Sequence, residues 1–311
     1  MPIKIMDGLS AKEKLHEEGI CTIDKGQALH QDIRPLHILI LNLMPLKKPT
    51  ELQLLRLLGD SPLQVEVDFC HTTTHESTHT NPSYLEHNYY VFDEIKHNYY
   101  DGLIITGAPV EQIPFEDVDY WPEITTYLDW ANTHAFSTLY FCWGAQAALY
   151  HYYGITKRLL PAKLFGIFEY QLTQSHHPLL RGFDDRYFIP QSRHTAIDDI
   201  QVYNTRQLEV LSRSAENGIN IIGTPDHRHF FVLGHFEYDR RTLETEYLRD
   251  KNKGLPIAVP KHYYPNDNDT KTPIFTWCSY AHLFYHNWLN IVYQETPYNL
   301  ADISHLSACA H

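Results

Sequence analysis

The sequence predicts an α/β protein with a parallel sheet that helices cover on both faces. Short and almost wholly apolar segments alternate with segments of helical periodicity, a pattern typical of parallel strands buried on both faces. The chain has 311 residues, of which 43% are hydrophobic and 20% charged, a balance that allows a sizeable core. We therefore expect one α/β domain without internal repeats.

The expected elements follow one another along the chain. Residues 1–34 are weakly patterned and predict an N-terminal arm that packs on something else, such as a partner subunit, with a short helix at 10–18 capped by Ser10. Residues 35–300 form the expected domain with a C-terminal helical extension, and residues 301–311 form a tail. The expected strands are 36–43, 65–69, 101–106, 137–141, 165–172, 187–189, 209–214, 219–222 and 230–233. The expected helices are 50–58, 121–132, 144–153, 240–251 and 276–294.

Composition excludes several classes of protein. The formal net charge of -13 argues against nucleic acid as a main partner, because phosphate binding needs a basic surface. No stretch approaches the roughly 18 apolar residues of a membrane span. The five cysteines are scattered and form no CxxC pair, which indicates free thiols in a reducing compartment. We expect a cytoplasmic protein. No metal site is expected, since the run holding His71, His75 and His79 is a poor helix former.

A cysteine stands where an apolar strand meets a helix, in Leu139-Tyr-Phe-Cys142-Trp-Gly-Ala-Gln146. This is the layout of a nucleophile elbow, in which a sharp turn projects the reactive side chain above the carboxyl edge of the sheet. The positive end of the helix dipole favours a thiolate there. The N–H of Trp143 could stabilise an oxyanion, with Gly107 or Ala108 as a second donor. The alternative is an inert core cysteine, since free cysteines are often buried.

A histidine and a glutamate two residues apart follow a later apolar segment, in Phe230-Phe-Val-Leu-Gly-His235-Phe-Glu237. On extended chain such side chains point the same way, so both could enter one pocket. His235 could then accept a proton while Glu237 orients the imidazole. A single histidine means little in a chain with 21 of them. The strand–Cys–helix motif together with this pair predicts a triad of Cys142, His235 and Glu237.

Cys-x-Gly-x-Gln with a later His-x-Glu resembles class I glutamine amidotransferases, which implies a flavodoxin-like sheet. The segments Asn42-Leu-Met-Pro-Leu-Lys-Lys-Pro-Thr50, Gly102-Leu-Ile-Ile-Thr-Gly-Ala-Pro109, Tyr140-Phe-Cys-Trp-Gly-Ala-Gln146 and Gly234-His-Phe-Glu-Tyr238 are more specific. They resemble the amidotransferase-like homoserine O-acyltransferases of methionine biosynthesis, over residues from about 2 to about 300. The resemblance implies acyl transfer from coenzyme A, as a co-substrate, to homoserine through a thioester on Cys142. No further cofactor is implied.

The resemblance also implies substrate contacts. Arg249 matches a clamp on the amino acid carboxylate, for which a guanidinium is geometrically suited. Lys163 and Ser192 match family positions that contact substrate, although Gln191 replaces the more usual histidine before Ser192. Read alone, all three would be solvated surface residues.

The residue at position 111 tracks the acyl donor in this family. A glycine there leaves room for a succinyl tail, whereas Glu111 fills space and repels the succinyl carboxylate. We therefore expect acetyl-coenzyme A as the donor, with succinyl-coenzyme A as the alternative.

Two other functions share parts of this pattern. A glutamine amidotransferase subunit would use the same triad to release ammonia, and a non-catalytic redox sensor could carry an oxidisable cysteine on the same fold. Glutamate production from glutamine, or the absence of acylated Cys142, would favour them. The N-terminal arm also makes a homodimer plausible.

Overall fold

The computed structural model describes residues 3–5, 9–17, 22–24, 34–74 and 80–306. Within them, one 11-stranded sheet runs in the order β2-β1-β4-β3-β5-β6-β11-β10-β9-β7-β8. The strands are β1 Ile3–Ile5, β2 Thr22–Asp24, β3 Leu36–Leu41, β4 Val65–Cys70, β5 Tyr100–Ile105, β6 Ala135–Phe141, β7 Lys157–Leu172, β8 Arg186–Ile197, β9 Glu209–Ser214, β10 Gly218–Gly223 and β11 His229–Val232. The helices are α1 Ala11–Glu17, α2 Lys47–Gly59, α3 Pro82–Asn88, α4 Phe92–Ile95, α5 Trp121–His134, α6 Trp143–Tyr153, α7 Asp199–Asn204, α8 Thr242–Asn252, α9 Cys278–Glu295 and α10 Ile303–Leu306.

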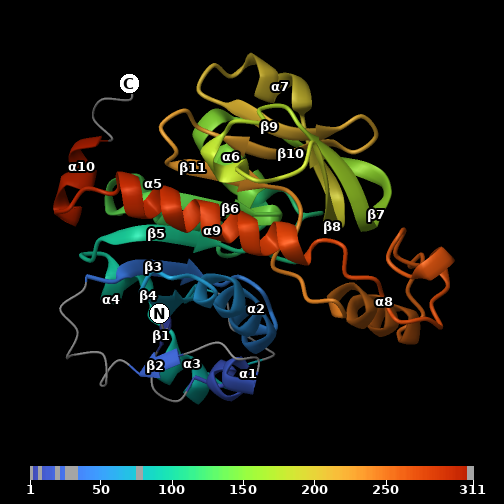
Figure 1. Cartoon of the computed structure of the whole chain (residues 1–311), viewed down its shortest axis with the longest axis horizontal. Coiled ribbons are helices and arrows are strands. Elements are labelled where there is room, and N and C mark those ends of the chain that lie inside the picture. The colour runs from blue at the N-terminus through green and yellow to red at the C-terminus, as the bar shows by residue number, and fades with distance from the viewer. Residues whose placement is uncertain (1–2, 6–8, 18–21, 25–33, 75–79, 307–311) are drawn as a thin grey trace.

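The sheet is parallel in one part and antiparallel in the other. From β2 to β11 neighbouring strands pair parallel, as the apolar segments predict. The strands β10, β9, β7 and β8 then pair antiparallel. The expected parallel pairing therefore holds from β2 to β11, and only the strands β7 to β10 depart from it among the described residues. Figure 1 shows this antiparallel part at one end of the molecule, and β1, β2 and α1 at the other.

Alternating side chains of the parallel strands enter two separate cores. On β3, Ile38 and Ile40 join the core beneath α2 and α9, whereas Leu39 and Leu41 join the core beneath α5 and α6. This alternation explains why the strand reads as a continuous apolar run. A third cluster joins β7 to α8 and the segment around Trp277.

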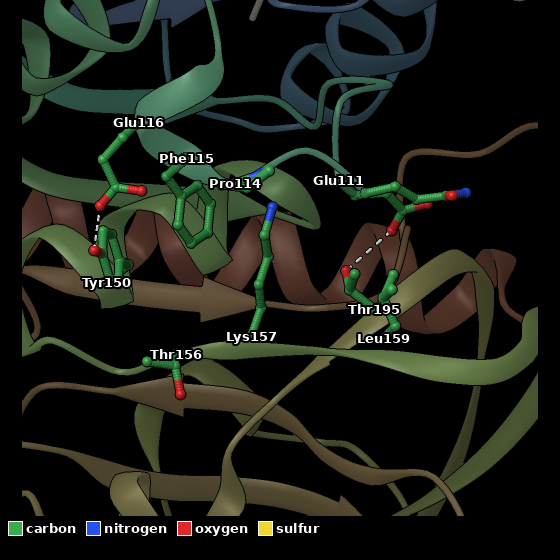
Figure 2. Close-up of a pocket in the computed structure, with 10 residues that line it drawn as sticks. Glu111, Pro114, Phe115, Glu116, Tyr150, Thr156, Lys157, Leu159 and Thr195 are labelled. Carbon is green, nitrogen blue, oxygen red and sulfur yellow. Dashed lines mark hydrogen bonds between the residues drawn. The ribbon is translucent and has the colours of Figure 1, made fainter.

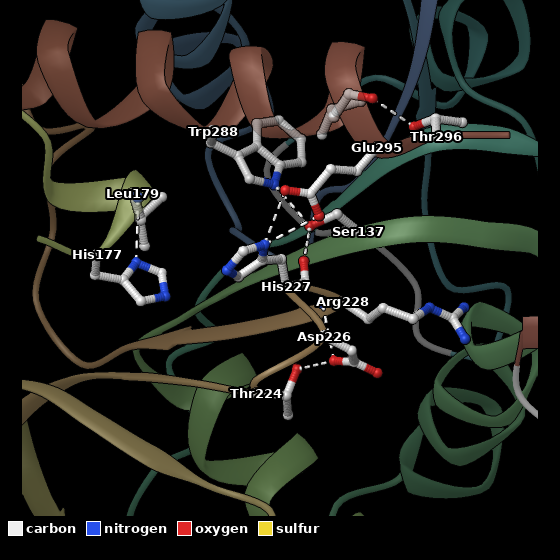
Figure 3. A network of polar contacts seen from close by, with 11 residues as sticks. Ser137, His177, Leu179, Thr224, Asp226, His227, Arg228, Trp288, Glu295 and Thr296 are labelled. Atoms are coloured by element: carbon white, nitrogen blue, oxygen red, sulfur yellow. Dashed lines mark hydrogen bonds and ion pairs between the residues drawn. The ribbon is translucent and has the colours of Figure 1, made fainter. Parts of the chain in front are cut away.

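The long helix α9 is fixed to the sheet by Trp288. The indole Nε1 donates to the hydroxyl of Ser137 at 3.1 Å, and that hydroxyl donates to the carbonyl of His227 at 2.8 Å (Figure 3). Close by, His227 Nδ1 lies 2.9 Å from Glu295 at the end of α9. Gly102 lets the helix approach, because an added Cβ would lie 2.7 Å from the Trp288 ring. A helix of 18 residues, about five turns, is thus held against β5 and β6.

The described part of the N-terminal arm packs on its own chain. The strand β1 pairs with β4 at the edge of the sheet, and Leu15 of α1 is fully buried in the core that contains α2. The helix predicted at 10–18 is confirmed as α1, and the Ser10 hydroxyl lies 3.1 Å from the Tyr84 hydroxyl. The predicted division of the chain at residues 34 and 300 stays a prediction.

Other expectations are met in part. Cys70, Cys142 and Cys278 are free thiols, and the remaining two cysteines lie outside the described residues. Among the described helices we find none with the length and apolar character that a membrane crossing requires. The histidine-rich run can be judged only at His71, because His75 and His79 also lie outside the described residues.

Candidate active site

Cys142 occupies the turn between β6 and α6 in a strained conformation. Its φ is 48° and its ψ is -112°, a region that residues with a Cβ rarely adopt. The backbone is held on both sides, since Cys142 N donates to Val232 O at 2.8 Å and Gln146 N donates to Cys142 O at 3.1 Å. The predicted elbow is therefore present, and its cysteine stands at the N-terminus of α6.

Two glycines make room for this turn. An added Cβ on Gly144 would lie 2.7 Å from the carbonyl oxygen of Thr106, so only glycine lets α6 begin this close to β5. An added Cβ on Gly107 would lie 3.2 Å from the Cβ of Cys142 and 3.8 Å from His235 Cε1. Gly107 therefore lies directly against Cys142, and a side chain there would crowd both Cys142 and His235. The oxyanion role of Gly107, Ala108 and Trp143 stays a prediction that this position favours.

His235 and Glu237 meet beside Cys142, although the local structure differs from the expectation. The strand β11 ends at Val232, so the pair lies in the turn after the strand rather than on extended chain. His235 Nδ1 nevertheless lies 2.7 Å from Glu237 Oε1, and both side chains are buried. The other ring nitrogen, Nε2, has no hydrogen-bond partner among the described residues, which leaves it available to the thiol.

The surroundings of His235 favour the imidazolium. Burial alone lowers the pKa of His235, but the negative charges of Glu237 and Cys142 outweigh burial and raise it from 6.5 to about 10. The ring of Tyr238 stacks on the imidazole with centroids 4.1 Å apart and an interplanar angle of 14°. Tyr238 is itself anchored by Trp277, whose Nε1 donates to its carbonyl oxygen at 2.8 Å. The imidazole ring is thus held at its edge by Glu237 and on one face by Tyr238.

A second polar cluster gathers around Glu246 on α8. Ser192 of β8 donates to both carboxylate oxygens, at 3.0 and 2.9 Å, and Lys163 of β7 forms an ion pair with the same group. Arg249 lies one turn along the helix, 3.9 Å from Glu246, while its guanidinium also holds Asp250 at 2.6 and 2.9 Å. The structure therefore brings Lys163, Ser192 and Arg249 together. Sequence reasoning missed Glu246, although its spacing of three from Arg249 places both on one helix face.

Glu111 points toward the interior rather than to open solvent. Its Oε2 lies 3.2 Å from the hydroxyl of Thr195 on β8 (Figure 2). The same hydroxyl lies 2.9 Å from Oε1 of Gln146, one helical turn after Cys142. A hydroxyl donates only one proton, so the two contacts compete for it. Sequence reasoning missed Thr195, because a β-branched residue in a strand has an ordinary structural explanation.

The described residues contain no cluster of three or more histidine, cysteine, aspartate or glutamate side chains that could hold a metal ion. The site instead holds a cysteine thiol, a histidine paired with a carboxylate, and nearby polar clusters. These are the components of covalent catalysis by a cysteine.

The cysteine elbow at the carboxyl edge of a parallel sheet, with a histidine and a glutamate beside it, defines a class I glutamine amidotransferase-like fold. Solved structures agree on this fold. A Thermoplasma acidophilum protein described as a GMP synthase subunit matches with a TM-score of 0.53 and 13% identity, covering 84% of this chain and 96% of that one. A glutamine amidotransferase from Thermotoga maritima matches with a TM-score of 0.52 and 13% identity, covering 85% and 100%.

Sequence comparison specifies the family within this fold. The homoserine O-succinyltransferase family model matches residues 2–298. A homoserine O-acetyltransferase of Desulfitobacterium hafniense is 51% identical over 97% of this chain and 99% of its own length. Proteins of the same name from Bacteroides fragilis and Brevibacillus brevis are 51% and 52% identical, over 97% and 96% of this chain and 100% and 98% of theirs. The chain belongs to this family of homoserine O-acyltransferases, as its motifs predicted.

Proposed function

We propose that the chain transfers an acetyl group from acetyl-coenzyme A to the hydroxyl of L-homoserine, a step of methionine biosynthesis. The observation that carries this proposal is the buried triad of Cys142, His235 and Glu237 in a member of this family. The proposed reaction has two half-reactions with an acyl-enzyme between them, which predicts ping-pong kinetics.

In the first half-reaction the Cys142 thiolate attacks the thioester carbonyl. Backbone N–H groups near Gly107 and Trp143 would stabilise the tetrahedral oxyanion. The carbon–sulfur bond to coenzyme A then breaks, the departing thiolate takes the proton of the His235 imidazolium, and the acetyl group remains on Cys142. The raised pKa of His235 supports this step, since it favours the imidazolium that the departing thiolate needs as a proton donor.

In the second half-reaction the neutral His235 accepts the proton of the homoserine hydroxyl. The alkoxide attacks the acyl-enzyme carbonyl, the bond to Cys142 breaks, and the cysteine leaves as a thiolate. Glu237 stabilises the imidazolium that forms again. The resting ion pair is thereby restored, and atoms and charges balance over the cycle.

The cluster on α8 suits the amino acid end of homoserine. The Glu246 carboxylate can accept from an α-ammonium group, while Lys163 and Arg249 are cations that can approach an α-carboxylate. Ser192 fixes the carboxylate of Glu246 through its two short contacts. We propose that these four residues bind homoserine. On binding, the Arg249 guanidinium would release the carboxylate of Asp250 and bind the carboxylate of the substrate.

Glu111 supports acetyl rather than succinyl as the acyl group. Its carboxylate lies at an inner position beside Thr195, where a second carboxylate would be repelled. The family model carries the name of a succinyltransferase, however, so succinyl-coenzyme A is the second candidate donor. The named relatives with 51% or more identity are acetyltransferases.

The test is the release of coenzyme A with homoserine present, with acetyl- and succinyl-coenzyme A compared side by side. We expect preference for the acetyl donor, and mass spectrometry should find one acetyl group on Cys142 when homoserine is omitted. A preference for the succinyl donor would retain the family and refute the role of Glu111. Release with neither donor, and glutamate formed from glutamine, would instead favour an amidotransferase.

Two further expectations belong to the same proposal. A cytoplasmic location fits a biosynthetic enzyme that uses coenzyme A, and a homodimer remains a prediction that light scattering can test.

A further inference from the structure

The described residues form an open cavity of about 290 Å³ beside Glu111, and none of its lining residues belongs to α8. We propose that this cavity binds the pantetheine arm of the thioester donor, with the nucleotide of coenzyme A remaining outside it. This inference rests on the proposed function and adds the location and chemistry of the donor site.

The walls of the cavity match a chain of methylene groups and amides. Phe115, Tyr150 and Leu159 supply apolar surface, and the rings of Phe115 and Tyr150 stack with centroids 4.8 Å apart. The Tyr150 hydroxyl donates to Glu116, which fixes that wall (Figure 2). Leu159 is 64% exposed, so its side chain is accessible to a ligand in the cavity. An apolar lining with a few fixed polar groups is typical of ligand pockets.

Lys157 supplies the cation at the cavity. Its ammonium lies over the Phe115 ring at 4.0 Å and donates to the carbonyl of Ile113 at 2.6 Å. This position holds the ammonium close to where an amide carbonyl of the arm would pass. Burial lowers the pKa of Lys157 to about 8 although Glu111 and Glu116 oppose the change. A hydrogen-bond acceptor entering the cavity would therefore meet a poorly solvated donor.

Charge and size both argue for the arm rather than the nucleotide. Glu111 and Glu116 line the cavity, and two carboxylates beside one lysine disfavour the phosphates of coenzyme A. A volume of 290 Å³ lies at the lower end for ligand sites, too small for the whole of coenzyme A. The arm is the uncharged part of the donor and the part that must reach the cysteine.

The cavity adjoins the nucleophile through the loop after β5, in which Glu111 lines the cavity and Gly107 lies against Cys142. Thr195 also lines the cavity and contacts Gln146. Gln146 begins the first hydrogen-bonded turn of α6 with Cys142. Its amide nitrogen is buried and has no partner among the described residues. The α8 residues Glu246 and Arg249 do not line this cavity, which separates the donor from the acceptor amino acid.

The test introduces a charge into the apolar wall without disturbing the core. Leu159→Asp changes an exposed side chain, so the fold should persist, and Leu306→Asp makes the same change on α10, where the leucine is 40% exposed. Lys157→Met removes the ammonium and keeps most of the stem. Each variant is assayed with acetyl-coenzyme A, with acetyl-pantetheine, and with S-acetyl-N-acetylcysteamine, which has a truncated arm.

We expect Leu159→Asp to raise KM for acetyl-coenzyme A and acetyl-pantetheine about tenfold, with KM for homoserine unchanged. Lys157→Met should raise the same two constants by a smaller factor. The truncated donor and the Leu306→Asp control should behave as in the wild type. An unchanged donor KM in both cavity variants, an equal effect on the truncated donor, or a change confined to homoserine would each overturn the proposal.

A loss seen with acetyl-coenzyme A and absent with acetyl-pantetheine would overturn it as well, since it would place the nucleotide in the cavity. The rate of the wild-type protein tests the proposed function. The ratio of the donor KM of each variant to that of the wild type tests the role of the cavity. The two can therefore fail separately.

Discussion

Replacing Glu237 by glutamine removes a charge from the triad and leaves its shape nearly unchanged. The carboxylate lies 2.7 Å from His235 Nδ1, and the two side chains are only 9% and 3% exposed, so solvent screens their interaction weakly. An opposite charge this close shifts a pKa by roughly 1 to 3 units, or about 1.4 to 4 kcal/mol. The equilibrium constant between the thiolate–imidazolium pair and the neutral pair should fall by the same factor, about 10-fold to 1,000-fold. We expect the rate of Cys142 acylation to fall by up to this factor, with the largest loss at the pH where the neutral pair becomes the main form.

The assay is the pre-steady-state burst of coenzyme A release without homoserine, followed beside the thiolate absorbance of Cys142. Glu169→Gln is the matched control, because Glu169 is an exposed partner of Arg186 on the antiparallel part of the sheet. A wild-type burst rate and a wild-type thiolate signal in Glu237→Gln would refute the assignment of Glu237 as the partner of His235. Loss of the burst in the control would point to a general effect on folding instead.

Four further outcomes follow from the described contacts. Glu246→Gln should raise KM for homoserine at least tenfold and spare the acetylation burst, and equal losses in both half-reactions would contradict a role in amino acid binding. Thr195→Val removes the hydroxyl that contacts the Glu111 carboxylate, and should increase the ratio of the rate with succinyl-coenzyme A to that with acetyl-coenzyme A several-fold. Thr195→Ser keeps the hydroxyl and should leave this ratio unchanged. Trp288→Ala should cost about 3 to 5 kcal/mol of unfolding free energy in denaturant titrations, with the exposed Tyr298→Ala neutral. The pKa of His235 in the folded protein is raised to about 10, so the stability that Glu237 adds should be complete below pH 6.5 and decline as pH rises toward 10. A difference in unfolding free energy between wild type and Glu237→Gln that grows with pH over this window would contradict the prediction.

The parallel half of the sheet could be predicted because its strands are buried on both faces. Apolar runs such as the one around Ile38 and Ile40 leave few alternatives, and the helices between them fix the direction of each crossover. Beyond Gly154 the strands β7 to β10 pair antiparallel, and a pattern of apolar residues does not state whether a strand runs parallel or antiparallel. The short strand β1 was missed for a different reason. Three residues are too few for periodicity to show.

The meeting of Cys142, His235 and Glu237 could be predicted because few other motifs place these residue types together. The reasoning for His235 and Glu237 assumed extended chain, whereas the structure reaches the same contact through a turn. Residues such as Tyr238, which contributes a stacked ring, carry no chemical signature in the sequence. Contacts that join distant elements, such as that of Thr195 with Gln146, become visible only when the strands are in place.

The backbone of Cys142 has a consequence for how the protein can lose its activity. The pair of angles near 48° and -112° resembles the first central position of a type II′ turn, where glycine is the favoured residue. A Cys142→Gly chain would therefore shed about 1 to 3 kcal/mol of conformational strain while losing its only thiol at the elbow. Such an inactive variant could fold more readily and unfold more slowly on heating than the active protein. Under the proposed mechanism, the thiol of Cys142 is kept at this position for catalysis, although the backbone angles of the turn favour glycine.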